Sequence, residues 1–93
     1  MKLIWTAPAL RQLADAREYI AVENPRAASR LIEQIETSVN RLRVFPLLGR
    51  PGVRDNTREL VVTSTPYVVV YRAESDAIYI LAVCHGATGW KSI

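Results

Sequence analysis

The sequence predicts an α+β fold with one domain, residues 1–93, in which a helical hairpin packs on a small, mostly antiparallel sheet. Three observations predict it. The first half of the chain carries two amphipathic helical patterns, and the second half carries three consecutive strand-like runs. A further short strand-like run, Lys2–Thr6, opens the chain. The expected order of elements is therefore β-α-α-β-β-β.

The first helix is predicted to begin at Thr6-Ala7-Pro8, which offers a hydroxyl cap and an early proline. Its apolar residues recur at spacings of four, three and four: Ala9, Leu13, Ala16 and Ile20. Asn24 can cap the second helix while Pro25 takes its first position, and Pro46 is expected to end it. The second stripe follows the same spacing, flanked by Leu31 and Phe45: Ala28, Ile32, Ile35, Val39 and Leu42. Both stripes predict core packing.

Residues 46–56 hold two prolines and two glycines and are predicted to form a loop. Strands are expected at 58–62, 66–72 and 78–87, with polar turns between them. The middle strand, Tyr67–Tyr71, is apolar on both faces, which predicts a central position in the sheet. With the helices on one face, we expect the other face to present a shallow groove.

Composition narrows the class of protein. The 49% of hydrophobic residues argues against disorder, and the net charge of +3 is too small to indicate nucleic-acid binding by itself. Cys84 is the only cysteine, so no internal disulfide can form and a reducing, cytoplasmic location is expected. No apolar run reaches the ~18–20 residues of a membrane helix. One cysteine and one histidine cannot supply a zinc site, so neither a metal nor a cofactor is expected.

The strand region carries the residues best suited to chemistry. His85, the only histidine, could act as an acid or base near neutral pH, or could simply bind a backbone carbonyl at a strand end. Arg58 and Arg72 could clamp a phosphate. Alternatively, Arg58 forms a salt bridge with Asp55 or with a neighbouring strand, and Arg72 is a solvated strand end. An RNA-cleaving set would combine these three residues with Glu59, or a tyrosine, as base; Glu59 could instead face solvent.

A surface that binds a macromolecular target could use the same strands. Tyr67 and Tyr71 share one strand face, and core packing is expected for at least two of the tyrosines Tyr67, Tyr71 and Tyr79. Arg50 and Arg54 lie in the predicted loop, where they could reach an acidic partner or remain solvated. The complete set of candidates for target binding is Arg50, Arg54, Arg58, Tyr67, Tyr71, Arg72 and His85.

The order of several short motifs resembles the ParE branch of the RelE/ParE toxins, which belong to bacterial type II toxin–antitoxin modules. The matching blocks are Phe45–Gly52, Thr57–Val62, Pro66–Arg72 and Ile78–Ala87, with Trp90 after them. The resemblance covers nearly the whole chain. It implies the β-α-α-β-β-β fold and a cognate ParD-like antitoxin that wraps the toxin in a hetero-oligomer.

The resemblance also implies a target. ParE-type toxins inhibit DNA gyrase and arrest growth, whereas RelE-type relatives are ribosome-dependent mRNA endonucleases with a catalytic tyrosine or histidine near the C-terminus. His85-Gly86-Ala87 is similar to a ParE ending and favours gyrase inhibition without catalysis over RNA cleavage. An inactive module that only assembles with its antitoxin is the third alternative. ParE-like tails often place an arginine before the tryptophan, and Thr88-Gly89 replaces it here, which puts the strength of toxicity in doubt.

The antitoxin is expected to add an amphipathic helix or a strand to the toxin. Its expected position is the apolar patch near Leu47, Leu48 and Trp90.

Overall fold

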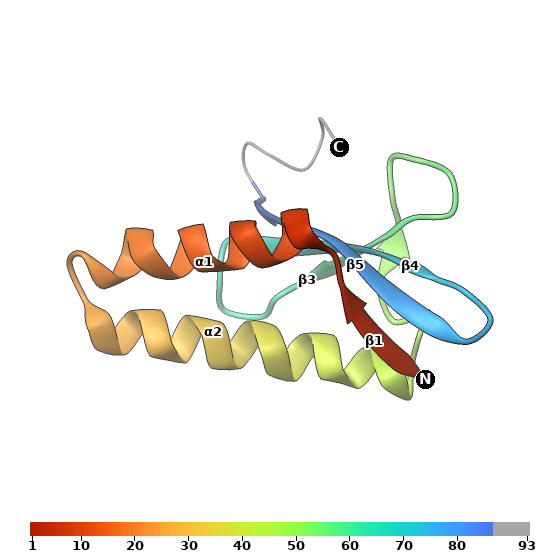
Figure 1. Ribbon diagram of the computed structural model, residues 1–93, viewed down its shortest axis with the longest axis horizontal. Coiled ribbons are helices and arrows are strands. Elements are labelled where there is room, and N and C mark those ends of the chain that lie inside the picture. Colours follow the sequence, from red (N-terminus) through yellow and green to blue (C-terminus); the bar gives the residue numbers. More distant parts are fainter. Residues whose placement is uncertain (87–93) are drawn as a thin grey trace.

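The computed structural model describes residues 1–86 and has two layers, a helical hairpin and a five-stranded sheet (Figure 1). The elements in chain order are β1 (Lys2–Trp5), α1 (Ala7–Ala21), α2 (Pro25–Asn40), the 3₁₀ turn η1 (Arg41–Arg43), β2 (Arg50–Pro51), β3 (Arg58–Val61), β4 (Tyr67–Ala73) and β5 (Ala77–His85). The strand order is β1-β5-β4-β3-β2, and only β1 and β5 pair in parallel. The predicted α+β class and the central position of β4 are confirmed.

Both helices begin where side-chain capping predicts. The Thr6 hydroxyl accepts a hydrogen bond from the Ala9 N–H, and Asn24 Oδ1 accepts one from the Ala27 N–H at 3.1 Å. The end of the second helix differs from the prediction, because α2 stops at Asn40 and tightens into η1. The tighter turn keeps Leu42 fully buried. Phe45, expected beside the apolar stripe, is instead 59% exposed.

The core lies between the hairpin and one face of the sheet. Alternate residues of the strands face the helices, as a period of two requires. The buried members from α2, β4 and β5 are Leu31, Ile35, Val39, Tyr67, Val69, Tyr71, Ile78, Ile80 and Val83. At least two tyrosines therefore pack in the core, as predicted.

A β-bulge in β5 lets this pattern change phase. Tyr71 pairs with Ile80 while Val70 pairs with Ala82, so Leu81 is an extra residue in β5. Because of the bulge, Ile80 and Val83 both face the helices although three positions separate them.

The other face of the sheet carries a smaller apolar cluster of Val70, Ala82 and Cys84, with Leu81 packed against it. These short side chains are buried although the hairpin covers the opposite face. The shallow groove expected on this face stays a prediction.

The predicted loop at 46–56 contains a short strand that the sequence pattern does not reveal. In β2, Arg50 pairs with Glu59 and Pro51 pairs with Arg58. The Gly52 N–H donates to the Thr57 carbonyl at 2.8 Å and closes this hairpin. Two residues are too few to produce an alternating pattern, so the loop prediction is wrong at Arg50 and Pro51.

Side chains of α1 and its cap complete the edge of β5 beyond the end of β1. Strand β1 pairs with β5 only as far as Ile80. The Thr6 hydroxyl donates to the Ile80 carbonyl at 2.7 Å, and Gln12 Oε1 accepts from the Val83 N–H at 2.7 Å. The glutamine thereby satisfies a backbone donor that has no strand partner on that side.

Gln12→Ala should lower the free energy of unfolding by about 1–3 kcal/mol, because it leaves the Val83 N–H without its acceptor. Gln12→Glu keeps an acceptor oxygen at the same reach and should retain most of the stability. Denaturant unfolding of both variants measures this difference. Equal stability of Gln12→Ala and the unmodified protein would show that the bond contributes nothing.

Candidate functional site

Two of the predicted target-binding residues, Tyr67 and His85, meet at one end of the β4–β5 pair. They are register partners, and their rings lie edge to face with centroids 5.7 Å apart and an interplanar angle of 72°. Tyr67 is buried, whereas His85 is exposed. The Gly86 N–H donates to the Pro66 carbonyl at 2.6 Å, which fixes the end of β5 beside the β3–β4 turn.

A groove of about 320 Å³ opens beside this ring pair, between the hairpin and the β3–β4 turn. Its apolar wall includes Tyr19, Ile20, Leu31 and Tyr67, and its polar groups come from Arg30, Gln34, Ser64, Thr65 and His85. Apolar walls with a few convergent polar groups are the usual composition of binding sites. Arg30 and His85 suit the groove to an acidic or aromatic side chain of a partner.

Sequence reasoning missed the contribution of the helices to this groove. Tyr19 is 78% exposed, which is unusual for a large aromatic side chain. A signal was present, because Tyr19 falls outside the apolar stripe formed by Ala16 and Ile20. Arg30 gives no comparable signal, because arginine is common on the exposed face of a helix.

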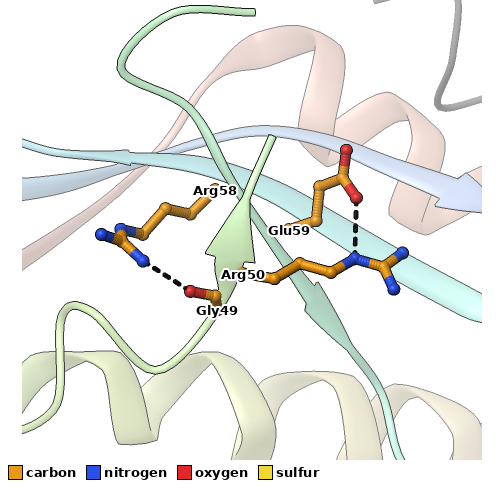
Figure 2. Close-up of polar contacts among 4 residues, drawn as sticks. All are labelled: Gly49, Arg50, Arg58 and Glu59. Carbon is orange, nitrogen blue, oxygen red and sulfur yellow. Dashed lines mark hydrogen bonds and ion pairs between the residues drawn. The ribbon is translucent and has the colours of Figure 1, made fainter. Parts of the chain in front are cut away.

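Arg58 lies at the other end of the sheet and holds a loop. Its Nη1 donates to the Gly49 carbonyl at 2.8 Å (Figure 2). Among residues 1–86, Arg58 makes no ion pair with Asp55. We therefore assign Arg58 a structural contact in place of the ion pair considered from the sequence.

Tyr71 fixes the same loop from the side of the hydrophobic core. Its hydroxyl donates to the Pro46 carbonyl and accepts from the Gly49 N–H, both at 2.8 Å. A Cβ at Gly49 would lie 2.7 Å from Tyr71 Cε1, so only glycine fits at this point. Tyr71 is fully buried and is not available to a macromolecular target.

Glu59 does not face solvent, contrary to one interpretation of the sequence. Glu59 is only 4% exposed, and its Oε1 lies 3.0 Å from Arg50 Nε. Figure 2 shows Arg50 and Arg58 extending in opposite directions from the β2–β3 pair, and only Arg50 reaches Glu59. A buried carboxylate requires such a partner, because desolvation of an unpaired charge is costly. Strand β2 supplies that partner, which the sequence pattern does not show.

The remaining predicted arginines are surface residues. Arg72 Nε lies 3.0 Å from Glu74 Oε1, in a pair whose side chains are 43% and 48% exposed. Such a pair contributes little to stability. Arg54 is exposed in the loop between β2 and β3.

The four residues of the predicted RNA-cleaving set lie apart. His85 is opposite Tyr67 and Arg58 is opposite Tyr71, which is four residues along β4 or about 13 Å at roughly 3.3 Å per residue. Glu59 and Arg72 lie on the other face of the sheet, by the alternation of their strands. The structure does not bring these four side chains to one scissile bond.

The buried tyrosines are poor substitutes for a general base. Burial raises the pKa of the Tyr67 hydroxyl above its ordinary 10.0, and nearby Tyr19 raises it further. Burial also raises the pKa of Tyr71, although the Gly49 hydrogen bond and Arg58 oppose the rise. Both hydroxyls therefore remain protonated at neutral pH.

Two of the three residues expected to contact an antitoxin belong to the part of the chain that the structure describes, and both are exposed. Leu47 is 66% exposed and Leu48 is 41% exposed, and Trp90 lies outside the described residues. Val44 and Phe45, just before them, are 72% and 59% exposed and extend the apolar surface. The sequence pattern does not indicate this extension, because it places Phe45 beside the apolar stripe of the second helix.

Two kinds of feature do not occur in residues 1–86. No group of three or more His, Cys, Asp or Glu side chains there could hold a metal ion. Among the same residues, no helix has the length and apolar character needed to cross a membrane.

Residues 3–90 match the family model described as "ParE toxin of type II toxin-antitoxin system, parDE". This chain belongs to the ParE toxin family. A relative from Sinorhizobium fredii, named "Putative toxin Y4kP", is 39% identical over 99% of this chain and 95% of its own length. "Toxin RelE2" of Caulobacter vibrioides is 34% identical over 92% of this chain and 96% of its own length.

The fold has a counterpart among solved structures. The structure titled "Chromosomal ParDE TA system from P. aeruginosa" contains a chain with a TM-score of 0.83 and 25% identity to this protein. The likeness covers 91% of this chain and 95% of that one. The predicted family and its two-layer fold are thus confirmed.

Tyr71→Phe should lower the free energy of unfolding by about 1–3 kcal/mol at neutral pH, because it removes the partner of the Gly49 N–H and the Pro46 carbonyl. The raised pKa means that the folded protein keeps this proton when the unfolded chain has lost it. Stability from Tyr71 is therefore complete below pH 10 and falls as the pH rises through the folded-state pKa.

Denaturant unfolding of the protein and the Tyr71→Phe variant between neutral and alkaline pH measures this effect. The difference in the free energy of unfolding between the unmodified protein and the variant should become smaller above pH 10.0. Tyr79→Phe, which alters a half-buried tyrosine of β5, is the matched control. A difference that grows with pH would contradict the assigned role.

Proposed function

We propose that this ParE-family toxin arrests growth by binding DNA gyrase, and that a cognate ParD-like antitoxin neutralises it in a hetero-oligomeric complex. The observation that carries the proposal is the match of the ParE family model across residues 3–90. The solved ParDE system from P. aeruginosa supports an antitoxin partner. Gyrase is a cytoplasmic target, so we place the toxin in the cytoplasm.

The arrangement of the candidate residues supports binding in place of catalysis. His85, Arg58, Glu59 and Arg72 are spread over both faces and both ends of the sheet, and two of them are engaged in structural contacts. The groove beside Tyr67 and His85 offers aromatic and cationic groups to a protein surface. We therefore assign target binding to this groove, with Tyr19 and Arg30 as its helical contribution.

Ribosome-dependent mRNA cleavage is the second candidate. One observation favours it: the His85 ring lies exposed at the end of a rigid strand, where it could reach a phosphate or a ribose hydroxyl. It requires the remaining catalytic groups to come from the ribosome, because Arg58 and Glu59 are held elsewhere. An inactive protein that only assembles with its antitoxin would show neither gyrase inhibition nor mRNA cleavage.

Gyrase inhibition is tested with purified gyrase, supercoiled plasmid and ATP, with trapped cleavage measured as linear DNA after detergent and protease treatment. Arg30→Glu should weaken inhibition at least about tenfold, equivalent to ~1.4 kcal/mol, because arginine contacts often dominate interfaces. Arg11→Glu makes the same charge reversal on the exposed surface of α1, outside the groove, and is the control.

The alternatives give different outcomes in cells lacking the antitoxin. Growth arrest with a DNA damage response and intact mRNA supports gyrase as target. Arrest with cut mRNA, abolished by His85→Ala, would replace the proposal with RNA cleavage. Absence of arrest would indicate the inactive module and would direct attention to Thr88-Gly89.

The antitoxin is proposed to cover the exposed apolar surface at Leu47 and Leu48. Leu48→Ala should weaken antitoxin binding by about tenfold, since burying a leucine side chain contributes roughly 1.5–3 kcal/mol and alanine retains part of it. Leu10→Ala on α1, whose leucine is 51% exposed, is the control. Titration calorimetry measures both. Unchanged affinity for Leu48→Ala and Leu47→Ala together would place the antitoxin elsewhere.

A further inference from the structure

The positive charge of this chain is concentrated in one segment. Residues 41–58 hold five of the 12 basic residues and one of the nine acidic residues, so the segment carries +4. The rest of the chain has seven basic and eight acidic residues and carries −1. The five basic residues of the segment are Arg41, Arg43, Arg50, Arg54 and Arg58. Such an asymmetry gives one part of a protein an attractive field for anions.

The fold gathers this segment at one end of the molecule. Figure 1 shows the end of α2, the β2–β3 hairpin and the β4–β5 turn at the end opposite the α1–α2 connection. Hydrogen bonds fix the loop between α2 and β2. The Phe45 N–H donates to the Arg41 carbonyl at 3.0 Å, and Gly49 is bonded by both Tyr71 and Arg58. The arginines of this basic end, residues 41–58, are therefore carried by a fixed backbone.

Three of these arginines have no acidic partner in the part of the chain that the structure describes. Arg50 is paired with Glu59, whereas Arg41, Arg43 and Arg54 are exposed and form no ion pair within residues 1–86. The negative end of the α2 dipole accounts for cations at Arg41 and Arg43. It does not account for Arg54, which lies in the β2–β3 hairpin, so a second reason for positive charge is needed here.

A cavity of about 290 Å³ opens in the basic end, lined by Leu47, Pro51, Asn56, Thr57, Arg58 and Ala73. None of these residues is acidic. Arg58 brings positive charge to the wall of the cavity while it holds Gly49, because that bond uses one of the five N–H donors of a guanidinium. Glu74, which follows Ala73 in the chain, is paired with Arg72. The cavity thus suits an anionic group.

The turn of the β2–β3 hairpin is also fixed. The Thr57 N–H and hydroxyl both donate to the Arg54 carbonyl, at 3.2 and 2.6 Å. Asn56 has a φ of 63°, in the left-handed region that asparagine tolerates better than most residues. The turn therefore holds Arg54 close in the chain to Asn56 and Thr57, which line the cavity.

We propose that the basic end binds the phosphate backbone of duplex DNA, with one phosphate in the cavity at Arg58 and neighbouring phosphates at the exposed arginines. A guanidinium matches the geometry of a phosphate. The choice of DNA among polyanions rests on the proposed target, since gyrase holds duplex DNA. The groove beside Tyr67 and His85 lies at the other end of β4, so one toxin can contact a protein and DNA together.

Fluorescence anisotropy of a labelled DNA duplex, titrated with purified toxin in the absence of gyrase, tests the proposal directly. Binding should weaken as salt rises from about 50 to 200 mM, with a slope of log K against log[salt] of about −2 to −4 for two to four phosphate contacts. No binding at the lowest salt concentration would overturn the proposal.

Two arginine variants locate the contacts. Arg43→Gln and Arg54→Gln should each weaken binding to all sequences and make the salt slope less negative by about 1. Arg26→Gln removes the same charge at the start of α2, roughly 20 Å from its end, and is the control. An equal effect of all three variants would show attraction by net charge without a site, and would overturn the assignment.

A charge placed in the cavity tests its role without removing the Arg58 contact. Leu47→Glu, at a side chain that is 66% exposed, should weaken DNA binding at least about tenfold. Leu10→Glu makes the same change on α1 and should weaken it less than about threefold. Thermal unfolding confirms that both variants are folded. Equal affinities of these two variants would remove the phosphate from the cavity.

The nature of the nucleic acid is tested with a single-stranded RNA of the same base sequence. The duplex DNA should bind more tightly at equal salt concentration. Tighter binding of the RNA would overturn the choice of DNA and support the second candidate function. Retained DNA binding by a toxin that does not inhibit gyrase would contradict the proposed function and would leave the DNA site in place.

Discussion

The hydroxyl of Tyr71 connects the core of this protein to the loop between η1 and β2. The ring is fully buried between the hairpin and the sheet, yet its oxygen bonds two backbone groups of the loop that follows η1. Those bonds place Gly49 against the sheet, and Arg58 bonds the same residue from β3. With Gly49 fixed, Arg50 can pair with Glu59 and supply the charge that a buried carboxylate needs. One side chain thus determines where β2 begins and why it is so short.

The fold was predictable from the sequence wherever a local physical rule acts alone. Thr6 and Asn24 cap helices because each places an oxygen within reach of the N–H three residues on. The spacing of Ala9 through Leu42 identifies most of the buried residues of the two helices. In α2, the exception is Ile32, which is half-buried, while Leu31 beside it is buried in the core. The bulge at Leu81 and strand β2 were not predictable, because each depends on contacts between residues far apart in the chain. The burial of Glu59 follows from β2 and escaped prediction for the same reason.

The candidate site was predictable in part. Tyr67 and His85 lie at neighbouring strand ends, and the sequence predicts both as candidates for target binding. Their groove depends equally on the two helices, whose exposed residues carry no pattern that marks them for binding. Arg58 and Tyr71 looked like residues for a target and instead hold Gly49. A long polar side chain in a strand can either bind a target or hold a loop of its own chain. Only the position of its hydrogen-bond partner in the folded protein decides between these two roles.

The pairing of β1 with β5 joins the two most distant strands in the described chain, since Leu3 lies beside Ile78. The contacts between α1 and α2 join residues that are close in the chain, so the hairpin can form early on a nascent chain. The sheet, in contrast, cannot close until β5 has emerged from the ribosome. His85 lies in β5, so the groove that we assign to the target cannot form before this strand is available. A nascent toxin therefore lacks a complete surface for its target until β5 has left the ribosome.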